Sequence, residues 1–217
     1  MSHPIKAVIF DKDGTLHDTE KLFRIAWHRA AEELNVPDME ATVIACTGRA
    51  IPGIAAYWAE KYPDIPFDDY LPVRQKHFHV LVAKEVPVKE GALEFLAYLK
   101  AHGYKIALAT SSPYDEAVDH LKRTNMYPYF DAVVGGDMIE NGKPAPDIYL
   151  LAAEKLGIAP ENCVGVEDSV NGILSIHAAG MRPIMVPDLI EPTPEIEKLL
   201  WAKCETLTDM IGVLERK

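Results

Sequence analysis

Hydrophobic residues follow two different periods along the chain, and the change of period divides it into regions. A short, β-branched apolar run at residues 7–10 (AVIF) predicts a buried strand of a parallel sheet. From residue 19 to about residue 34, apolar positions recur every three to four residues, which predicts an amphipathic helix. Further helical patterns follow to about residue 84 without a strand pattern. We therefore expect one strand followed directly by a wholly helical segment.

The rest of the chain alternates between the two patterns. Predicted strands lie at residues 104–109, 130–136, 162–166 and 182–186, with helical patterns between them and two more, at residues 193–203 and 207–217, in the tail. This alternation predicts right-handed β-α-β units and a parallel sheet covered on both faces. The expected fold class is therefore α/β, with an inserted helical domain. We place the core at residues 1–16 and 85–217 and the insertion at residues 17–84.

Composition narrows the possible partners. The chain has 217 residues, 48% of them hydrophobic, and a formal net charge of −11, which argues against a nucleic-acid backbone or an anionic membrane as partner. No apolar run approaches the ~20 residues that span a bilayer. The start of the sequence shows no signal-peptide pattern, and the three cysteines form no C-x-x-C pair. We expect a cytoplasmic monomer that acts on a small molecule.

Polar residues follow four of the predicted strands in turn. In chain order they are Asp11 and Asp13, then Thr110, Ser111 and Ser112, then Lys143, then Glu167, Asp168 and Ser169. Because ligands bind at the carboxyl ends of the strands in such sheets, we expect these side chains to share one edge.

The chemistry of this set points to a cation and a phosphate. Carboxylates a few ångströms apart repel one another, so a positive charge should stand between them. The oxygens of Asp11 and Asp168 suit Mg²⁺, which would offset that repulsion. The hydroxyls, the helix N-terminus after Ser112 and the ammonium of Lys143 would hold a phosphate. Gly14 would allow a tight backbone turn beneath it.

Each motif alone also has a plainer interpretation. A D-x-D-G sequence after a strand is often an Asx turn. Ser111 and Ser112 could be helix caps, Lys143 a solvated loop residue, and the pair Glu167–Asp168 the start of a helix. Their appearance in order on four strand ends favours a common site.

The motifs DKDGTL, ATSS, GKPAPDIYL and GVEDSVNGI resemble those of the haloacid dehalogenase (HAD) superfamily. The resemblance is to the subgroup with a helical cap after the first strand, which includes β-phosphoglucomutase-like sugar-phosphate phosphatases. It implies a Rossmann-like core, a mobile cap, Mg²⁺ as cofactor and a covalent aspartyl-phosphate intermediate.

The resemblance also implies roles for individual residues. Asp11 would be the nucleophile and a metal ligand, and Asp13 the general acid and base, with its backbone carbonyl on the metal. Asp168 would bind the metal, and Glu167 would do so directly or through water. The phosphoryl group would be positioned by Thr110, Ser111 and Lys143.

Three further positions carry separate expectations. Lys12 stands where relatives more often have an apolar residue, and on an extended segment its side chain should point away from Asp11 and Asp13. Arg49 and Lys76 resemble cap positions that meet the substrate in sugar-phosphate relatives, although each could equally be a solvated cation. The helical histidines, His120 among them, are expected at the surface or the edge of the core.

The predicted function is a Mg²⁺-dependent phosphatase acting on a small phosphate monoester, a sugar or polyol phosphate. The main alternative is a β-phosphoglucomutase-type mutase. Such relatives carry a histidine at the position of Phe23, and a lysine and an asparagine where this chain has Pro113 and Tyr114. A phospho-aspartate signalling module is a second alternative, but it lacks a large insertion after the first strand. A dehalogenase is a third, and Asp13 argues against it.

Overall fold

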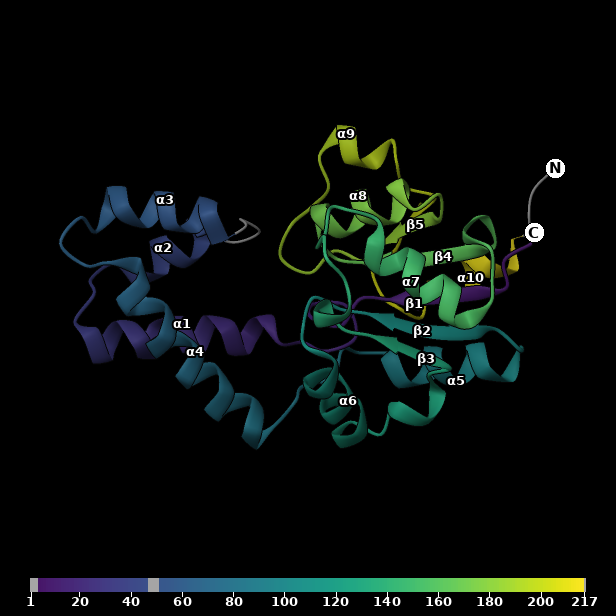
Figure 1. Cartoon of the computed structure of the whole chain (residues 1–217), viewed down its shortest axis with the longest axis horizontal. Coiled ribbons are helices and arrows are strands. Elements are labelled where there is room, and N and C mark those ends of the chain that lie inside the picture. Colours follow the sequence, from purple (N-terminus) through teal and green to yellow (C-terminus); the bar gives the residue numbers. More distant parts are fainter. Residues whose placement is uncertain (1–3, 47–50, 217) are drawn as a thin grey trace. The chain divides into compact units, whose positions relative to one another are not determined.

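The computed structural model describes residues 4–46 and 51–216. The chain divides into two compact units, a core unit of Met1–His17 with Val88–Lys217 and a helical unit of Asp18–Pro87 (Figure 1). The boundaries expected from the sequence lie one residue earlier at the first crossing and three residues earlier at the second. The fold class, an α/β core with an inserted helical domain, is confirmed.

The core unit contains a parallel sheet and the helices that cover it. Its strands are β1 (Ala7–Phe10), β2 (Lys105–Ala109), β3 (Ala132–Val134), β4 (Cys163–Glu167), β5 (Arg182–Met185) and β6 (Ala202–Lys203). Its α-helices are α5 (Ala92–Ala101), α6 (Tyr114–Arg123), α7 (Asp147–Leu156), α8 (Val170–Ala178), α9 (Pro194–Glu197) and α10 (Met210–Glu215).

The order of the strands indicates where a ligand crevice is expected. The sheet runs β3-β2-β1-β4-β5-β6, and every neighbouring pair is parallel. The chain moves outward from β1 to β2 and β3, then returns through α7 to β4 on the other side of β1 (Figure 1). Because the strand order reverses at β1, its carboxyl end is where a ligand crevice is expected in this kind of sheet.

Alternating side chains of each strand build two separate cores. On β1, Val8 and Phe10 belong to the cluster shared with α5, α6 and α10, whereas Ala7 and Ile9 belong to the cluster shared with α7 and α8. All four side chains are fully buried. Side chains of a strand alternate between the two faces of the sheet, and helices cover both faces, so every position of a central strand is buried. The central strands are therefore continuous apolar runs.

One part of the tail differs from the prediction. The helix expected at residues 193–203 is limited to α9, and Ala202–Lys203 forms β6 instead. The backbone N–H of Trp201 donates to the carbonyl of Pro183 at 2.8 Å, which joins this segment to the edge of the sheet. Hydrogen bonding to β5 therefore overrides the local helical pattern, a tertiary effect that sequence periodicity does not report.

The helical unit is built around aromatic side chains. It consists of α1 (Glu20–Leu34), α2 (Met39–Cys46), α3 (Ile51–Lys61) and α4 (Phe67–Lys84). Trp58 is fully buried, and its ring lies 4.2 Å from that of Tyr70 and 6.1 Å from that of Trp27. These aromatics therefore stabilise the unit from within. Across the described residues, no helix has both the length and the apolar character to cross a membrane.

Candidate active site

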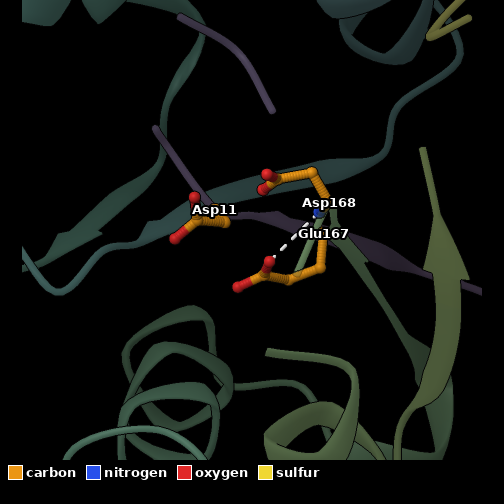
Figure 2. Close-up of side chains that lie close together, drawn as sticks. All are labelled: Asp11, Glu167 and Asp168. Carbon is orange, nitrogen blue, oxygen red and sulfur yellow. Dashed lines mark hydrogen bonds between the residues drawn. The ribbon is translucent and has the colours of Figure 1, made fainter. Parts of the chain in front are cut away.

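Three carboxylates meet at the carboxyl ends of β1 and β4. Phe10 pairs with Val166 in the sheet, so Asp11 and Glu167, one residue further along each strand, come side by side. Asp11, Glu167 and Asp168 each offer an oxygen, and these oxygens lie within 4.8 Å of one another (Figure 2). These strand-end carboxylates therefore share one edge of the sheet, as expected, and all three belong to the core unit.

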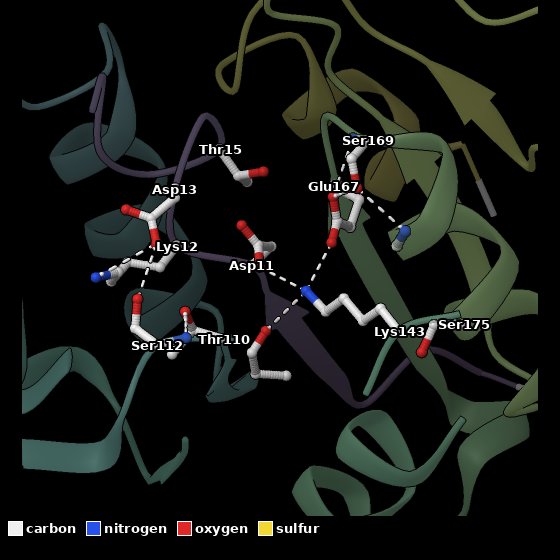
Figure 3. Close-up of polar contacts among 12 residues, drawn as sticks. Asp11, Lys12, Asp13, Thr15, Thr110, Ser112, Lys143, Glu167, Ser169 and Ser175 are labelled. Carbon is white, nitrogen blue, oxygen red and sulfur yellow. Dashed lines mark hydrogen bonds and ion pairs between the residues drawn. The ribbon is translucent and has the colours of Figure 1, made fainter. Parts of the chain in front are cut away.

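Lys143 lies among these acids and binds two of them. Its Nζ donates to Asp11 Oδ1 at 2.5 Å, to Glu167 Oε1 at 2.7 Å and to the carbonyl of Ala109 at 3.2 Å (Figure 3). A hydrogen bond holds the loop that carries Lys143, because Ser175 Oγ donates to the carbonyl of Ala145 at 2.6 Å. Lys143 therefore belongs to the site and is not a solvated loop residue.

The acids outnumber the cation that pairs with them. Burial raises the pKa of Asp11 to about 7; Lys143 opposes this rise, whereas Glu167 and Asp13 add to it. Burial lowers the pKa of Lys143, but Asp11 and Glu167 outweigh it and hold that pKa well above its ordinary range. Lys143 is thus a fixed positive charge that offsets only part of the negative charge. A second cation would relieve the rest.

The donor set fits Mg²⁺. Carboxylate oxygens are the ligands that this hard cation prefers, and it uses few of them. Asp168 is oriented by Thr15, whose Oγ1 donates to Asp168 Oδ1 at 3.1 Å. Glu167 is more heavily bonded, since its Oε2 accepts from Asp168 N at 3.1 Å, from Ser169 N at 3.0 Å and from Ser169 Oγ at 2.9 Å. Asp11 and Asp168 are therefore the better placed direct ligands.

Gly14 makes room for Asp168, which gives a first prediction. A Cβ at Gly14 would lie 2.3 Å from Asp168 Oδ2, and its φ of +84° disfavours any other residue. We expect Gly14→Ala to weaken Mg²⁺ binding by about 10-fold or more, because it displaces a ligand. Isothermal titration with Mg²⁺ measures this.

The matched control is Gly103→Ala. Gly103 has a similar φ of +77°, but a Cβ there would meet nothing within 4 Å. This variant shares the backbone strain without the clash, so it should keep wild-type affinity. Equal affinities for Mg²⁺ in all three proteins would contradict the role given to Gly14.

The two hydroxyls of Thr110 and Ser112, after β2, make different contacts. Thr110 Oγ1 accepts from Ser112 N at 3.1 Å, and Ser112 Oγ donates to Asp13 Oδ2 at 3.1 Å. Ser111 is exposed in the loop that follows the strand.

Neither Ser111 nor Ser112 caps α6, so their plainer interpretation as helix caps is wrong. The N-cap is Pro113, and the first N–H of the helix, that of Tyr114, donates to Asp137 Oδ1 at 2.8 Å. A carboxylate from another segment thus takes the place that a local hydroxyl would have at the start of this helix.

The expected direction of Lys12 is wrong with respect to Asp13. Lys12 Nζ lies 3.4 Å from Asp13 Oδ2. The prediction assumed an extended segment, but the backbone turns here, since the N–H groups of Leu16 and His17 both donate to the carbonyl of Lys12. Alternation along a strand does not apply within a turn.

The two predicted substrate residues belong to the inserted segment. Lys76 lies on α4, where its exposed Nζ is 3.4 Å from Glu33 Oε1. Arg49 lies outside the described residues. Their contact with substrate stays a prediction.

The sequence reasoning missed Thr15 and Tyr149, which support the site, and it gave Ser112 no role toward Asp13. Thr15 orients Asp168, Ser112 holds Asp13, and the hydroxyl of Tyr149 donates to Glu167 Oε1 at 3.3 Å. The adjacency of Thr15 to the D-x-D-G turn was a usable signal. Tyr149 gave none, because it occupies an ordinary apolar position of a helix.

Comparisons with known proteins agree with this geometry. The family described as haloacid dehalogenase-like hydrolase matches residues 5–180. The chain is 37% identical, over 83% of its length and 84% of the relative's, to a phosphorylated carbohydrates phosphatase of Thermotoga maritima. It is 31% identical, over 86% of its length and 88% of the relative's, to β-phosphoglucomutase of Bacillus subtilis.

A solved structure is similar over nearly the whole chain. This HAD family hydrolase from Deinococcus radiodurans R1, with bound phosphate and sodium, has a TM-score of 0.81 and 29% identity and covers 97% of this chain and 95% of its own. Fold, strand-end acids and family match point to the same conclusion. The chain belongs to the haloacid dehalogenase-like hydrolase family.

Proposed function

We propose that the protein is a Mg²⁺-dependent phosphatase that hydrolyses a sugar or polyol phosphate through an aspartyl-phosphate on Asp11. The observation that carries this proposal is the cluster of Asp11, Glu167 and Asp168, whose oxygens lie within 4.8 Å of one another, with Lys143 bonded to two of them. A buried carboxylate beside a fixed cation suits attack on a phosphate, whose negative charge the cation attracts.

The reaction takes two steps. An oxygen of Asp11 attacks phosphorus while Asp13 gives its proton to the leaving alcohol oxygen as the P–O bond breaks. Asp13, now a carboxylate, takes a proton from a water that attacks the aspartyl-phosphate and releases inorganic phosphate. Thr110, Ser111 and Lys143 hold the oxygens of the phosphoryl group during both steps.

Mg²⁺ would be held by the carboxylates of Asp11 and Asp168 and by the backbone carbonyl of Asp13. Glu167 would act through water, since its Oε2 already accepts three hydrogen bonds. When bound, the ion would supply positive charge that stabilises the phosphoryl oxygens and offsets the repulsion among the acids.

The test of this proposal is a substrate panel. Hexose, pentose and polyol monophosphates, with nucleotide monophosphates for contrast, are incubated with the protein and Mg²⁺, and released phosphate is measured. We expect sugar or polyol phosphates to give the highest kcat/KM, and a strong chelator to abolish release. Absence of phosphate release across the whole panel would contradict the proposal.

The second candidate is a phosphosugar mutase, supported by the similarity to β-phosphoglucomutase. Phe23, where those relatives carry a histidine, has no group that can exchange a proton, and its ring stacks on that of Phe78 with centroids 3.9 Å apart. We expect β-glucose 1-phosphate with a trace of the 1,6-bisphosphate to yield free phosphate. Efficient conversion to glucose 6-phosphate with little free phosphate would establish the mutase instead.

A further inference from the structure

A group of four buried side chains, three of them basic, lies beside Asp13 and takes no part in the steps above. Lys12 and His17 are fully buried, His120 is 3% exposed, and Thr124 is also buried. We call these four residues the Lys12 cluster. The expectation that His120 lies at the surface or the edge of the core was wrong. It lies on the inner face of α6, where its Nδ1 is 3.1 Å from Lys12 Nζ.

The contact between Lys12 and His120 fixes the state of the imidazole. An ammonium group has no acceptor, so Lys12 Nζ donates and His120 Nδ1 accepts. The ring proton of His120 is therefore on Nε2, and the ring is neutral. Burial and the charge of Lys12 both lower the pKa of His120, in agreement with this assignment.

His17 is neutral because it is buried, and its Nε2 carries the ring proton. Thr124 Oγ1 donates its one hydrogen to the carbonyl of His120 at 2.8 Å, so it accepts from His17 Nε2 at 3.1 Å. Burial lowers the pKa of His17 to about 3, despite the opposing effect of Asp13. Lys12 is thus the single cation of the Lys12 cluster, and neither imidazole competes with it for the neighbouring carboxylates.

The charge of Lys12 is directed at Asp13 and α6. Its Nζ lies 3.4 Å from Asp13 Oδ2 and 3.5 Å from Glu116 Oε1. Ser112 Oγ donates to the same Oδ2 atom of Asp13 at 3.1 Å (Figure 3). The Lys12 ammonium and the Ser112 hydroxyl, which come from two different segments, therefore converge on one carboxylate oxygen.

We propose that Lys12 is a positioning residue for Asp13: held by His120, its ammonium keeps the Asp13 carboxyl in the orientation that transfers the proton. This inference rests on the proposed function, in which Asp13 gives its proton to the leaving alcohol. Burying a charge this completely costs free energy. If Lys12 only filled space, an apolar side chain of similar volume could replace it without loss of activity.

Lys12→Met tests this, because methionine is an unbranched side chain only one atom shorter than lysine and carries no charge. Thermal unfolding should show some loss of stability, because Asp13 and Glu116 lose the ammonium that pairs with them and His120 Nδ1 loses its donor. The activity is therefore measured at a temperature where the variant is folded. For the best sugar or polyol phosphate of the panel, we expect kcat/KM to fall by about 10-fold or more, as misplacement of a general acid predicts. For 2,4-dinitrophenyl phosphate it should stay within about 3-fold of wild type, because dinitrophenolate leaves without a proton.

A pair of substitutions at His120 supplies the second measurement. His120→Asn keeps an acceptor for Lys12, whereas His120→Leu removes it. We expect the leucine variant to show the same selective loss on the alkyl ester and the asparagine variant to retain most of the activity. This pair tests the proposal even where Lys12→Met fails to fold.

The possible outcomes separate the two proposals. A selective loss on the alkyl ester supports the role of Lys12. An equal loss on both esters, or none on either, overturns it and leaves the phosphatase proposal standing. A wild-type protein that hydrolyses neither ester overturns the proposed function itself.

Discussion

Replacing Asp11 with asparagine is expected to lower kcat for the best phosphate ester by on the order of 10⁴-fold or more, as loss of a nucleophile does elsewhere. A carboxamide is a poor nucleophile and cannot form the acyl phosphate, so the first step fails. The substitution also removes one of the three clustered carboxylates and the negative charge that pairs with Lys143. Steady-state phosphate release measures the loss. Acid quench with radiolabelled substrate should label the wild-type chain and leave Asp11→Asn unlabelled.

The fold should survive this change. Lys143 keeps its bond to Glu167 at 2.7 Å, and the loss of one charge reduces repulsion among the remaining acids. The matched control is Asp119→Asn, which alters an exposed aspartate paired with Arg123 at 3.4 Å and should leave kcat unchanged. Turnover by Asp11→Asn within about 10-fold of wild type would rule out Asp11 as nucleophile.

The central part of the site followed from the sequence because it depends on simple geometry. A run of apolar residues that is buried on both faces must be a central strand, and residues after such strands share an edge. Asp11 and Glu167 are neighbours for this reason alone. Lys143 reaches them from a longer loop, so its position could be expected from the motif resemblance but not from periodicity.

The predictions that failed concern features that depend on contacts between distant segments. Lys12 turns toward Asp13 because the backbone folds back on the carbonyl of Lys12, and no local pattern encodes that turn. β6 forms because Trp201 and its neighbours join the edge of the sheet, although the residues read as helical. His120 is buried because the helix face that it occupies covers Lys12. In each case tertiary structure outweighed local preference.

Removal of Lys143 should have the largest effect on stability. In Lys143→Met, Asp11 and Glu167 would lose their shared partner while their side chains remain 10% and 2% exposed. Breaking a buried ion pair in this way costs about 3–5 kcal/mol, because the remaining charges are left uncompensated. We expect the free energy of unfolding, measured by urea denaturation in a chelator, to fall by that amount.

The matched control is Lys105→Met, because Lys105 is 54% exposed and lies 3.0 Å from Asp131 Oδ1. An exposed pair of this kind is worth at most about 1 kcal/mol, so this variant should unfold close to wild type. Equal free energies of unfolding in the two variants would show that Lys143 does not neutralise the buried acids.

Mg²⁺ should restore part of the stability that Lys143→Met loses. An ion that binds the folded state alone stabilises it in proportion to its affinity, and the acids left without Lys143 would attract the ion more strongly. Saturating Mg²⁺ is therefore expected to raise the free energy of unfolding more in Lys143→Met than in wild type. The phosphatase activity of the variant should stay low, because the phosphoryl oxygens lose a cation. Repeating the urea series with and without Mg²⁺ measures the difference. If Mg²⁺ stabilises the two proteins equally, Lys143 and the metal do not share the task of neutralising Asp11 and Glu167.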